Sequence, residues 1–258
     1  MVDPRYQALF SQAKGVTAYL DGYICASPHS KAKAPRCQSE LDVAYLAEPA
    51  HGDLLDPKSD NQDKLASIYQ TLEQNYPEAG HAYWLSRTWS LLTWQPVYIS
   101  LLSIYGLKAL PELDSLTQVW RPDLNFVAGF GLNGAQFYSD CPEVLISKAA
   151  SQLKPLFESY REQLDSNVRV RPAFVNHLLA DGLVASLLRF QQHLPLDANQ
   201  LAKHAKLWLQ AFGLPEKSLE KLHFNSQTQL WEYTRTSCCM AYRCASGSLC
   251  QDCPRKKT

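Results

Sequence analysis

The pattern of apolar and polar positions predicts a chain made largely of α-helices. Apolar residues recur at every third or fourth position over several long stretches, which is the spacing that places them on one face of a helix. The first clear example is residues 61–76, where Leu65, Ile68 and Leu72 share a face. Pro77 follows directly, so we expect this helix to end there.

The next part of the chain is apolar almost throughout. We expect two helices here, over residues 83–94 and 97–107, because Pro96 lies between them and proline interrupts helical hydrogen bonding. The first stretch contains three tryptophans, which form either an aromatic cradle for a ligand or part of the core. Aromatic residues at helical spacing are usually core residues, and we favour that interpretation for Trp84, Trp89 and Trp94.

Three further helices are predicted in the second half of the chain. The clearest covers residues 140–164, where Asp140 and Glu143 have the spacing of an N-terminal capping box. A second covers residues 172–190, and its predicted first residue is a proline. A third covers residues 197–213 and ends at a glycine, the commonest residue at the C-terminal end of a helix.

Between residues 110 and 138 the pattern changes from helical to strand-like. Aromatic and β-branched residues alternate with Pro, Asn and Gly, which predicts two or three short antiparallel strands. This region contains GFGLNG, residues 129–134, which matches the glycine pattern of dinucleotide-binding turns. No strand–helix alternation surrounds it, so we assign these glycines to a hairpin turn rather than to a nucleotide site.

Together these patterns predict a mainly α fold with a small antiparallel β element and a cysteine-rich C-terminal segment. We expect residues 1–225 to form the helical body and residues 226–258 to form the cysteine-rich segment. A chain of 258 residues buries enough apolar surface to fold without disulfides or metal. The clustered cysteines therefore indicate chemistry rather than structural support.

Charge excludes some classes of partner. The chain has 25 basic and 25 acidic residues, so as a whole it has no character of a nucleic-acid-binding protein. The last 24 residues are different, with five basic residues and one acidic residue. No apolar run reaches the length of a transmembrane helix and the N-terminus lacks the pattern of a secretory signal, so we expect a cytoplasmic protein with reduced thiols.

Five of the eight cysteines lie between residues 238 and 253. Cys250 and Cys253 are separated by two residues, the spacing with which one turn directs two sulfurs at one metal site. Cys238 and Cys239 are adjacent, and side chains of adjacent residues in a strand point to opposite faces. Both can serve one site if the backbone bends or if the site is larger than a single ion.

Spacing alone favours an iron–sulfur cluster but leaves zinc open. Structural zinc sites normally use two cysteine pairs that are each separated by two to four residues, and an adjacent pair does not supply this. A two-iron cluster spreads its four thiolates more widely and so tolerates irregular spacing better. The fifth cysteine, Cys244, forms C-x₄-C with Cys239, and we expect it not to be a ligand.

The pattern CC-x₁₀-C-x₂-C at the C-terminus of a helical chain resembles the FhuF-like ferric-siderophore reductases. The lead-in RTSCC, which begins at Arg235, is also similar. The resemblance is specific only over about the last 20 residues. It implies that a 2Fe–2S cluster is bound by four cysteines, namely Cys238, Cys239, Cys250 and Cys253.

The resemblance also implies a function, the one-electron reduction of Fe³⁺ in a siderophore, of the hydroxamate type, with release of Fe²⁺. Arg235 and Arg243 are then candidates for substrate binding, because cations near the cluster attract an anionic ligand. The sequence has no flavin or nicotinamide signature, so an external protein such as a ferredoxin or a flavoprotein is expected to donate electrons. The alternatives are an iron–sulfur sensor or regulator and a structural zinc module without catalysis.

Overall fold

The computed structural model describes residues 3–25, 52–194 and 196–256, and most of this part of the chain is helical. The mainly α character expected from the sequence is therefore confirmed. The α-helices in chain order are α1 (Arg5–Val16), α3 (Gln62–Asn75), α4 (His81–Leu101), α5 (Pro142–Asp165), α6 (Pro172–Arg189) and α7 (Ala198–Phe212). A π-helical turn, η1 (Leu102–Gly106), continues α4, and three 3₁₀ turns are present, namely η2 (Pro122–Leu124), η3 (Glu216–Lys221) and η4 (Ala241–Arg243).

The strands form a four-stranded sheet and two small ribbons. The sheet has the order β1-β5-β4-β2, made of β1 (Gly22–Ile24), β5 (Phe126–Leu132), β4 (Thr117–Arg121) and β2 (Asp53–Leu55). The expected antiparallel pairing of β4 with β5 is confirmed, but β1 joins β5 in parallel, which the pattern did not predict. The ribbons are β3 (Ala109–Leu110) with β6 (Tyr138–Ser139), and β7 (Leu222–Asn225) with β8 (Leu230–Tyr233).

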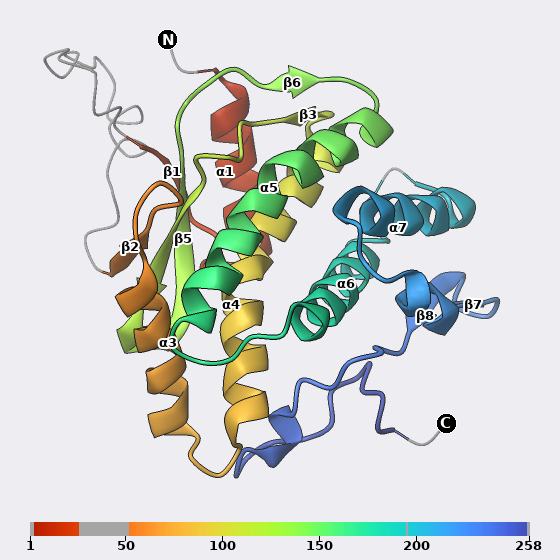
Figure 1. Cartoon of the computed structure of the whole chain (residues 1–258). Coiled ribbons are helices and arrows are strands. Elements are labelled where there is room, and N and C mark those ends of the chain that lie inside the picture. The colour runs from red at the N-terminus through yellow and green to blue at the C-terminus, as the bar shows by residue number, and fades with distance from the viewer. Residues whose placement is uncertain (1–2, 26–51, 195, 257–258) are drawn as a thin grey trace, which may run out of the picture.

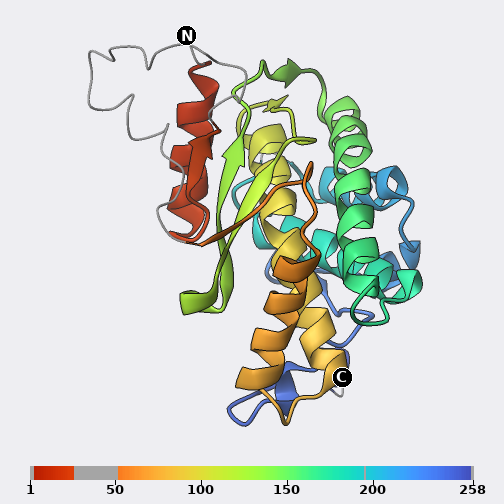
Figure 2. The ribbon, with the colours of Figure 1, turned by 60° about the vertical axis from the view of Figure 1, so that its left-hand side comes forward.

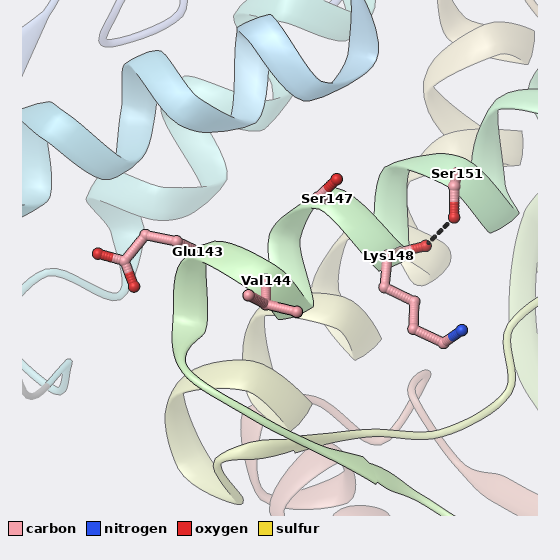
Figure 3. A pocket seen from close by; sticks show the side chains of 5 residues that line it. All are labelled: Glu143, Val144, Ser147, Lys148 and Ser151. Atoms are coloured by element: carbon pink, nitrogen blue, oxygen red, sulfur yellow. Dashed lines mark hydrogen bonds between the residues drawn. The ribbon is translucent and has the colours of Figure 1, made fainter.

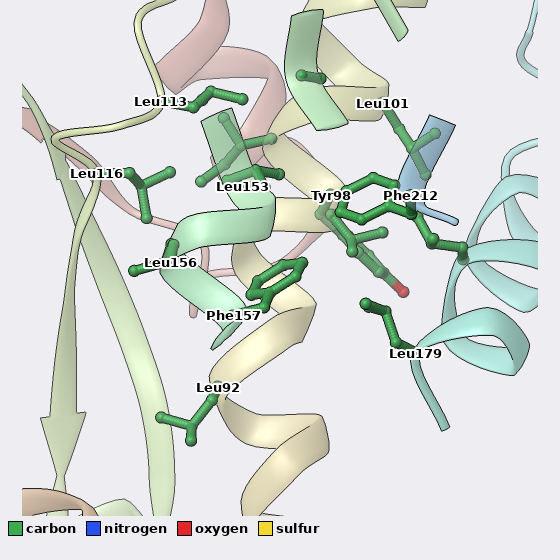
Figure 4. Close-up of a cluster of buried hydrophobic side chains, with 14 of the residues drawn as sticks. Leu92, Tyr98, Leu101, Leu113, Leu116, Leu153, Leu156, Phe157, Leu179 and Phe212 are labelled. Atoms are coloured by element: carbon green, nitrogen blue, oxygen red, sulfur yellow. The ribbon is translucent and has the colours of Figure 1, made fainter. Parts of the chain in front are cut away.

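The long helices pack side by side with the sheet. Figure 1 shows the sheet on the left, α4 and α5 in the centre, and α6 and α7 on the right. The core lies between these layers, and Figure 4 shows Phe157 of α5 among leucines from several elements. The ring of Phe157 stacks on Phe212 of α7 at 6.0 Å between centroids and meets Trp89 of α4 edge-on at 6.3 Å. Helix α4 is therefore the central element of the fold.

The three tryptophans of α4 belong to the core, as expected. Trp89 is buried, and Trp84 and Trp94 pack against the core with one edge accessible. The indole N–H groups of these two edge residues donate to main-chain carbonyls, Trp84 to Tyr76 and Trp94 to Val127. The indoles are thus used for packing and for binding neighbouring segments.

The predicted capping box of the 140–164 helix is wrong, although the helix itself is confirmed as α5. The N-cap is Cys141 and the first helical residue is Pro142. Asp140 instead accepts a hydrogen bond from the backbone N–H of Cys141. Proline is well suited to the first helical position because it has no N–H to satisfy there, so the helix begins one residue later than the capping-box pattern predicted.

The assignment of the glycines at 129–134 to a hairpin turn is also wrong. Gly129 and Gly131 lie within strand β5, and Gly131 pairs with Thr117 of β4. A Cβ on Gly131 would lie 2.5 Å from both Cys25 Sγ and Thr117 Oγ1. Glycine is required there because side chains from both neighbouring strands, β1 and β4, lie against its backbone.

Pro96 does not separate two helices, contrary to the prediction, because α4 continues through it. A proline within a helix leaves the carbonyl four residues earlier, here that of Leu92, without its N–H donor. The side-chain amide of Gln118, which is fully buried on β4, donates to this carbonyl at 2.9 Å. A side chain from the sheet therefore replaces the missing helical hydrogen bond.

Replacing Gln118 by methionine is expected to lower the free energy of unfolding by about 1–3 kcal/mol. The shape of the side chain is nearly kept, but the buried Leu92 carbonyl loses its donor, and an unsatisfied buried acceptor costs about this amount. Urea unfolding followed by circular dichroism measures the change.

A double-mutant cycle provides the control for this explanation. Pro96→Ala supplies the N–H that bonds the Leu92 carbonyl within the helix, so Gln118→Met should cost less in that background. An equal cost in both backgrounds would show that Gln118 stabilises the fold in some other way, for example through its contact with the hydroxyl of Tyr160 at 3.2 Å.

Candidate metal centre

The cysteines of the cysteine-rich segment follow β8, and this part of the segment runs along the ends of α3 and α4 (Figures 1 and 2). Figures 1 and 2 both show this segment at the base of the molecule, beside the connection between these two helices. The carbonyl of Cys239 lies 3.0 Å from Ser86 Oγ on α4. The backbone N–H of Ala245 donates to Glu78 of the α3–α4 connection at 2.8 Å. The segment is thus held against the helical body at defined points.

The structure brings two of the four predicted ligands together. Cys239 Sγ and Cys250 Sγ are 3.3 Å apart and both side chains are half-buried. Cys253 is buried and Cys238 is half-buried. Within the described residues, no three His, Cys, Asp or Glu side chains are arranged to hold a single metal ion. The assignment of all four ligands stays a prediction.

The spacing of the two sulfurs fits shared binding of one metal. Two thiolates bound tetrahedrally at about 2.3 Å from a metal lie roughly 3.7 Å apart. The sulfurs of Cys239 and Cys250 therefore need to move apart only slightly to bind one metal. The turn that carries Cys250 is closed by a hydrogen bond from the N–H of Cys253 to the Cys250 carbonyl at 3.2 Å. The donor set at this point is sulfur, which suits an iron–sulfur cluster.

Arg235 is the cation of this site. Its Nη2 donates to Cys239 Sγ at 3.5 Å, and its Nε lies 3.0 Å from a carboxylate oxygen of Asp252. Burial would lower the pKa of Arg235, but Asp252 and Cys239 outweigh it and hold the pKa above its usual value. Arg235 therefore contributes a permanent positive charge beside the sulfurs.

The two neighbouring thiols differ in acidity. Burial raises the pKa of Cys239, but hydrogen bonds from the backbone N–H of Ala241, from Cys250 and from Arg235 outweigh it and lower the pKa. The pKa of Cys250 is raised by burial and by the adjacent Cys239. In the protein without metal, Cys239 is therefore the more acidic thiol of the pair.

A buried aspartate on helix α6 holds the segment that precedes the adjacent cysteines. Asp181 is 1% exposed, and both of its carboxylate oxygens accept hydrogen bonds. Ser237 donates its backbone N–H at 2.6 Å and also its hydroxyl, and Thr236 donates its hydroxyl at 2.9 Å and its N–H at 3.2 Å. Ser218 and the hydroxyl of Tyr233 complete the set. The carboxylate thus fixes the backbone directly before Cys238.

Asp181 was not found from the sequence. It lies within the helix predicted over residues 172–190, and it is buried. The signal was a single acidic residue, with Ala180 and Gly182 beside it, in the otherwise apolar middle of a helix. A lone carboxylate in such a position needs donors from elsewhere in the chain.

Among the described residues, no hydrogen bond joins Cys244 or Arg243 to the pair formed by Cys239 and Cys250. Cys244 forms a side-chain hydrogen bond with Tyr83 of α4, which with burial raises the pKa of Tyr83. Arg243 is exposed on η4. The role of Cys244 and the role of Arg243 both stay predictions.

A comparison with protein families bears directly on this segment. Residues 235–255 match the family described as the FhuF 2Fe-2S C-terminal domain. The C-terminal segment is therefore similar to the FhuF 2Fe-2S C-terminal domain. The match confirms the resemblance seen in the sequence and points to a 2Fe–2S cluster as the cofactor.

A cleft opens beside the FhuF domain. Its volume is about 510 Å³, which lies in the range of small-molecule sites, and it is bounded by α3, α4, the η2–β5 junction and the cysteine-rich segment. Cys239, Cys250 and Arg235 contribute to its wall, whereas Arg243 does not. A small molecule in this cleft would therefore lie next to the two sulfurs.

A second hollow has no comparable features. Figure 3 shows that its lining residues all come from one face of α5, namely Glu143, Val144, Ser147, Lys148 and Ser151. Side chains from a single helix face do not converge on a ligand. The FhuF domain is therefore the part of the described chain where chemistry is concentrated.

Among the helices of the described residues, each is either too short or too polar to reach across a bilayer.

Proposed function

We propose that this protein is a ferric-siderophore reductase. The observation that carries the proposal is the FhuF domain, whose Cys239 and Cys250 line a cleft of about 510 Å³. The FhuF family is associated with ferric-siderophore reduction, which supports an oxidoreductase. The cleft supplies the space in which an iron chelate comes close to the cysteines.

The reaction follows from the chemistry of iron. Siderophores hold iron through hard oxygen ligands, which bind Fe³⁺ far more strongly than Fe²⁺. Adding one electron to the bound Fe³⁺ therefore loosens the metal without changing the organic ligand. When bound, the 2Fe–2S cluster supplies electrons one at a time, which matches this step.

The residues of the chain have separate tasks in this proposal. Cys238, Cys239, Cys250 and Cys253 hold the cluster, and Arg235 places a positive charge beside it. Tight chelation lowers the potential of the iron, by about 59 mV for each tenfold preference for Fe³⁺ over Fe²⁺. A buried cation next to the sulfurs raises the potential of the cluster, so Arg235 adjusts how strong a reductant the protein is.

The finer assignments are part of the proposal. The substrate is a siderophore of the hydroxamate type, the reaction takes place in the cytoplasm, and a separate ferredoxin or flavoprotein supplies the electrons. The division into a body of residues 1–225 and a cluster-binding segment of residues 226–258 belongs to the same proposal.

The experiment starts from freshly purified protein under anaerobic conditions. We expect a red-brown colour that dithionite bleaches and that returns when a ferric trihydroxamate is added, with one Fe²⁺ released per electron. A ferrous chelator present in the solution measures the released iron. Stoichiometric zinc in a colourless protein would establish the structural zinc module instead, and a reduced cluster that ferric chelates leave bleached would favour a sensor.

A further inference from the structure

We infer that the cleft selects iron chelates of net negative charge and that Arg87 is the residue responsible. This inference rests on the proposed function, because it names the class of chelate that the reductase accepts. It concerns the side of the cleft formed by α4 and by the η2–β5 junction, which lies outside the FhuF domain.

Arg87 is half-buried in the wall of the cleft. Its guanidinium carbon lies 5.4 Å from the centre of the ring of Phe126, which also lines the cleft. An aromatic face orients a guanidinium group but leaves its N–H donors free for a carboxylate or another anionic oxygen. Arg87 therefore presents donors to whatever occupies the cleft.

The charge of Arg87 is not neutralised by the described part of the protein. No carboxylate among the described residues lies within 4.0 Å of it, and none lines the cleft. The other arginine of the cleft, Arg235, is different because it is paired with Asp252 and donates to Cys239. Arg87 is thus available to balance the charge of a ligand.

A second polar group in the wall lacks a partner. Asn125 lies at the junction of η2 and β5 with a left-handed backbone, φ 50°. Its Oδ1 is shielded from solvent and makes no hydrogen bond to any described residue. An unpaired buried amide oxygen costs free energy unless a donor reaches it. Asn125 as a residue lines the cleft next to Phe126.

On the side of the cleft that contains Arg87, the arrangement opposes a cationic group of the ligand. A chelate carrying an ammonium group would meet Arg87 with no carboxylate in the cleft to compensate, whereas a chelate carrying a carboxylate would gain a charge-assisted hydrogen bond. The selection acts on the outer groups of the chelate, so it is compatible with iron held by hydroxamates.

The test uses gallium(III), which has the charge of Fe³⁺ but is not reduced. Two hexadentate trihydroxamates are compared that differ only in a side arm, one ending in a carboxylate and the other in an ammonium group. Titration calorimetry with the cluster-containing protein should show tighter binding of the carboxylate form. Arg87→Gln should weaken that form by about five- to tenfold and leave the ammonium form unchanged or tighter. Arg87→Lys should keep the preference.

Arg169→Gln is the matched control, because it removes one positive charge from an exposed arginine outside the cleft. It should leave the preference intact. Equal binding of both chelates by the wild type, or a preference that survives Arg87→Gln, would overturn the inference, as would loss of the preference in Arg243→Gln alone.

The ferric forms of the same chelates separate this inference from the proposed function. Reoxidation of the reduced protein with the same KM for both chelates would support the proposed reductase function and contradict the role of Arg87 in selecting the chelate. If the gallium chelates bind with charge selectivity but the ferric chelates do not reoxidise the protein, the proposed reductase function is contradicted and the charge selectivity of the cleft is supported.

Discussion

Cys250→Ser is expected to abolish the visible absorbance of the cluster, whereas Cys244→Ser is expected to leave it unchanged. Both substitutions exchange sulfur for oxygen in the same segment, so they form a matched pair. Cys250 lies 3.3 Å from Cys239 in the wall of the cleft, while Cys244 contacts Tyr83. Removing a thiolate from a four-thiolate cluster removes one of its bonds to iron, and metal binding here is coupled to the order of the segment.

The measurement is iron and acid-labile sulfide per protein, together with the visible spectrum. We expect Cys250→Ser to fall below about a tenth of the wild-type iron content and Cys244→Ser to match the wild type. Equal loss in both variants would mean that the ligand set is wrong. Retention in both would mean that Cys250 is not a ligand.

The same comparison tests the identity of the metal. A cluster-free Cys250→Ser protein that retains stoichiometric zinc would show that the site binds a single ion through the remaining cysteines. A 2Fe–2S site is expected to retain neither iron nor zinc in stoichiometric amount. Because the site lies at the surface of the helical body, we expect the far-ultraviolet circular dichroism of both variants to remain that of the wild type.

The sequence predicts the helices of this protein well because their apolar faces pack against each other. The 61–76 pattern corresponds to α3, and the helix predicted over residues 197–213 corresponds to α7, which begins with a capping box at Asp197. The prediction that Pro96 ends a helix is wrong for a reason that cannot be read from the neighbouring residues. The compensating donor, Gln118, is 26 residues from the carbonyl it satisfies.

In the candidate site too, features set by neighbouring residues can be predicted from the sequence, whereas features that depend on contacts between distant residues cannot. The cysteine spacing identifies the domain because all four predicted ligands lie within 16 residues. The cleft depends on Arg87, Asn125 and Phe126, which the fold brings to the cysteines from other elements. Arg243, by contrast, was chosen for its nearness in sequence, and the structure leaves it exposed and outside the cleft.

Asp181→Asn is expected to destabilise the cluster more than any other single change in the helical body. The asparagine would direct an amide N–H₂ at donors that now meet a carboxylate oxygen, among them the backbone N–H and the hydroxyl of Ser237. Hydrogen bonds to a charged group contribute about 1.5–3 kcal/mol each, and leaving buried donors unpaired costs a similar amount. We expect the segment before Cys238 to lose at least about 2 kcal/mol of local stability.

Three measurements test whether this loss of local stability affects the cluster. Amide hydrogen exchange should accelerate at residues 233–240, the half-life of the visible absorbance in the presence of a chelator should shorten, and the midpoint potential should shift. The midpoint potential of the cluster depends on hydrogen bonds and solvent near the sulfurs. It therefore distinguishes a role of Asp181 in positioning the cysteines from a general effect on the stability of the protein. These effects should appear while α4 and α5 keep their protection.

Asp165→Asn is the matched control for this substitution. Asp165 also accepts a backbone hydrogen bond, from Val170 at 2.6 Å, but it lies at the end of α5 and makes no described contact with the cysteine-rich segment. It should leave exchange at residues 233–240 and the midpoint potential unchanged. If both variants shortened the life of the cluster equally, Asp181 would act only through the stability of the whole body. A selective effect of Asp181→Asn would instead show that one buried carboxylate on α6 sets the position of the adjacent cysteines.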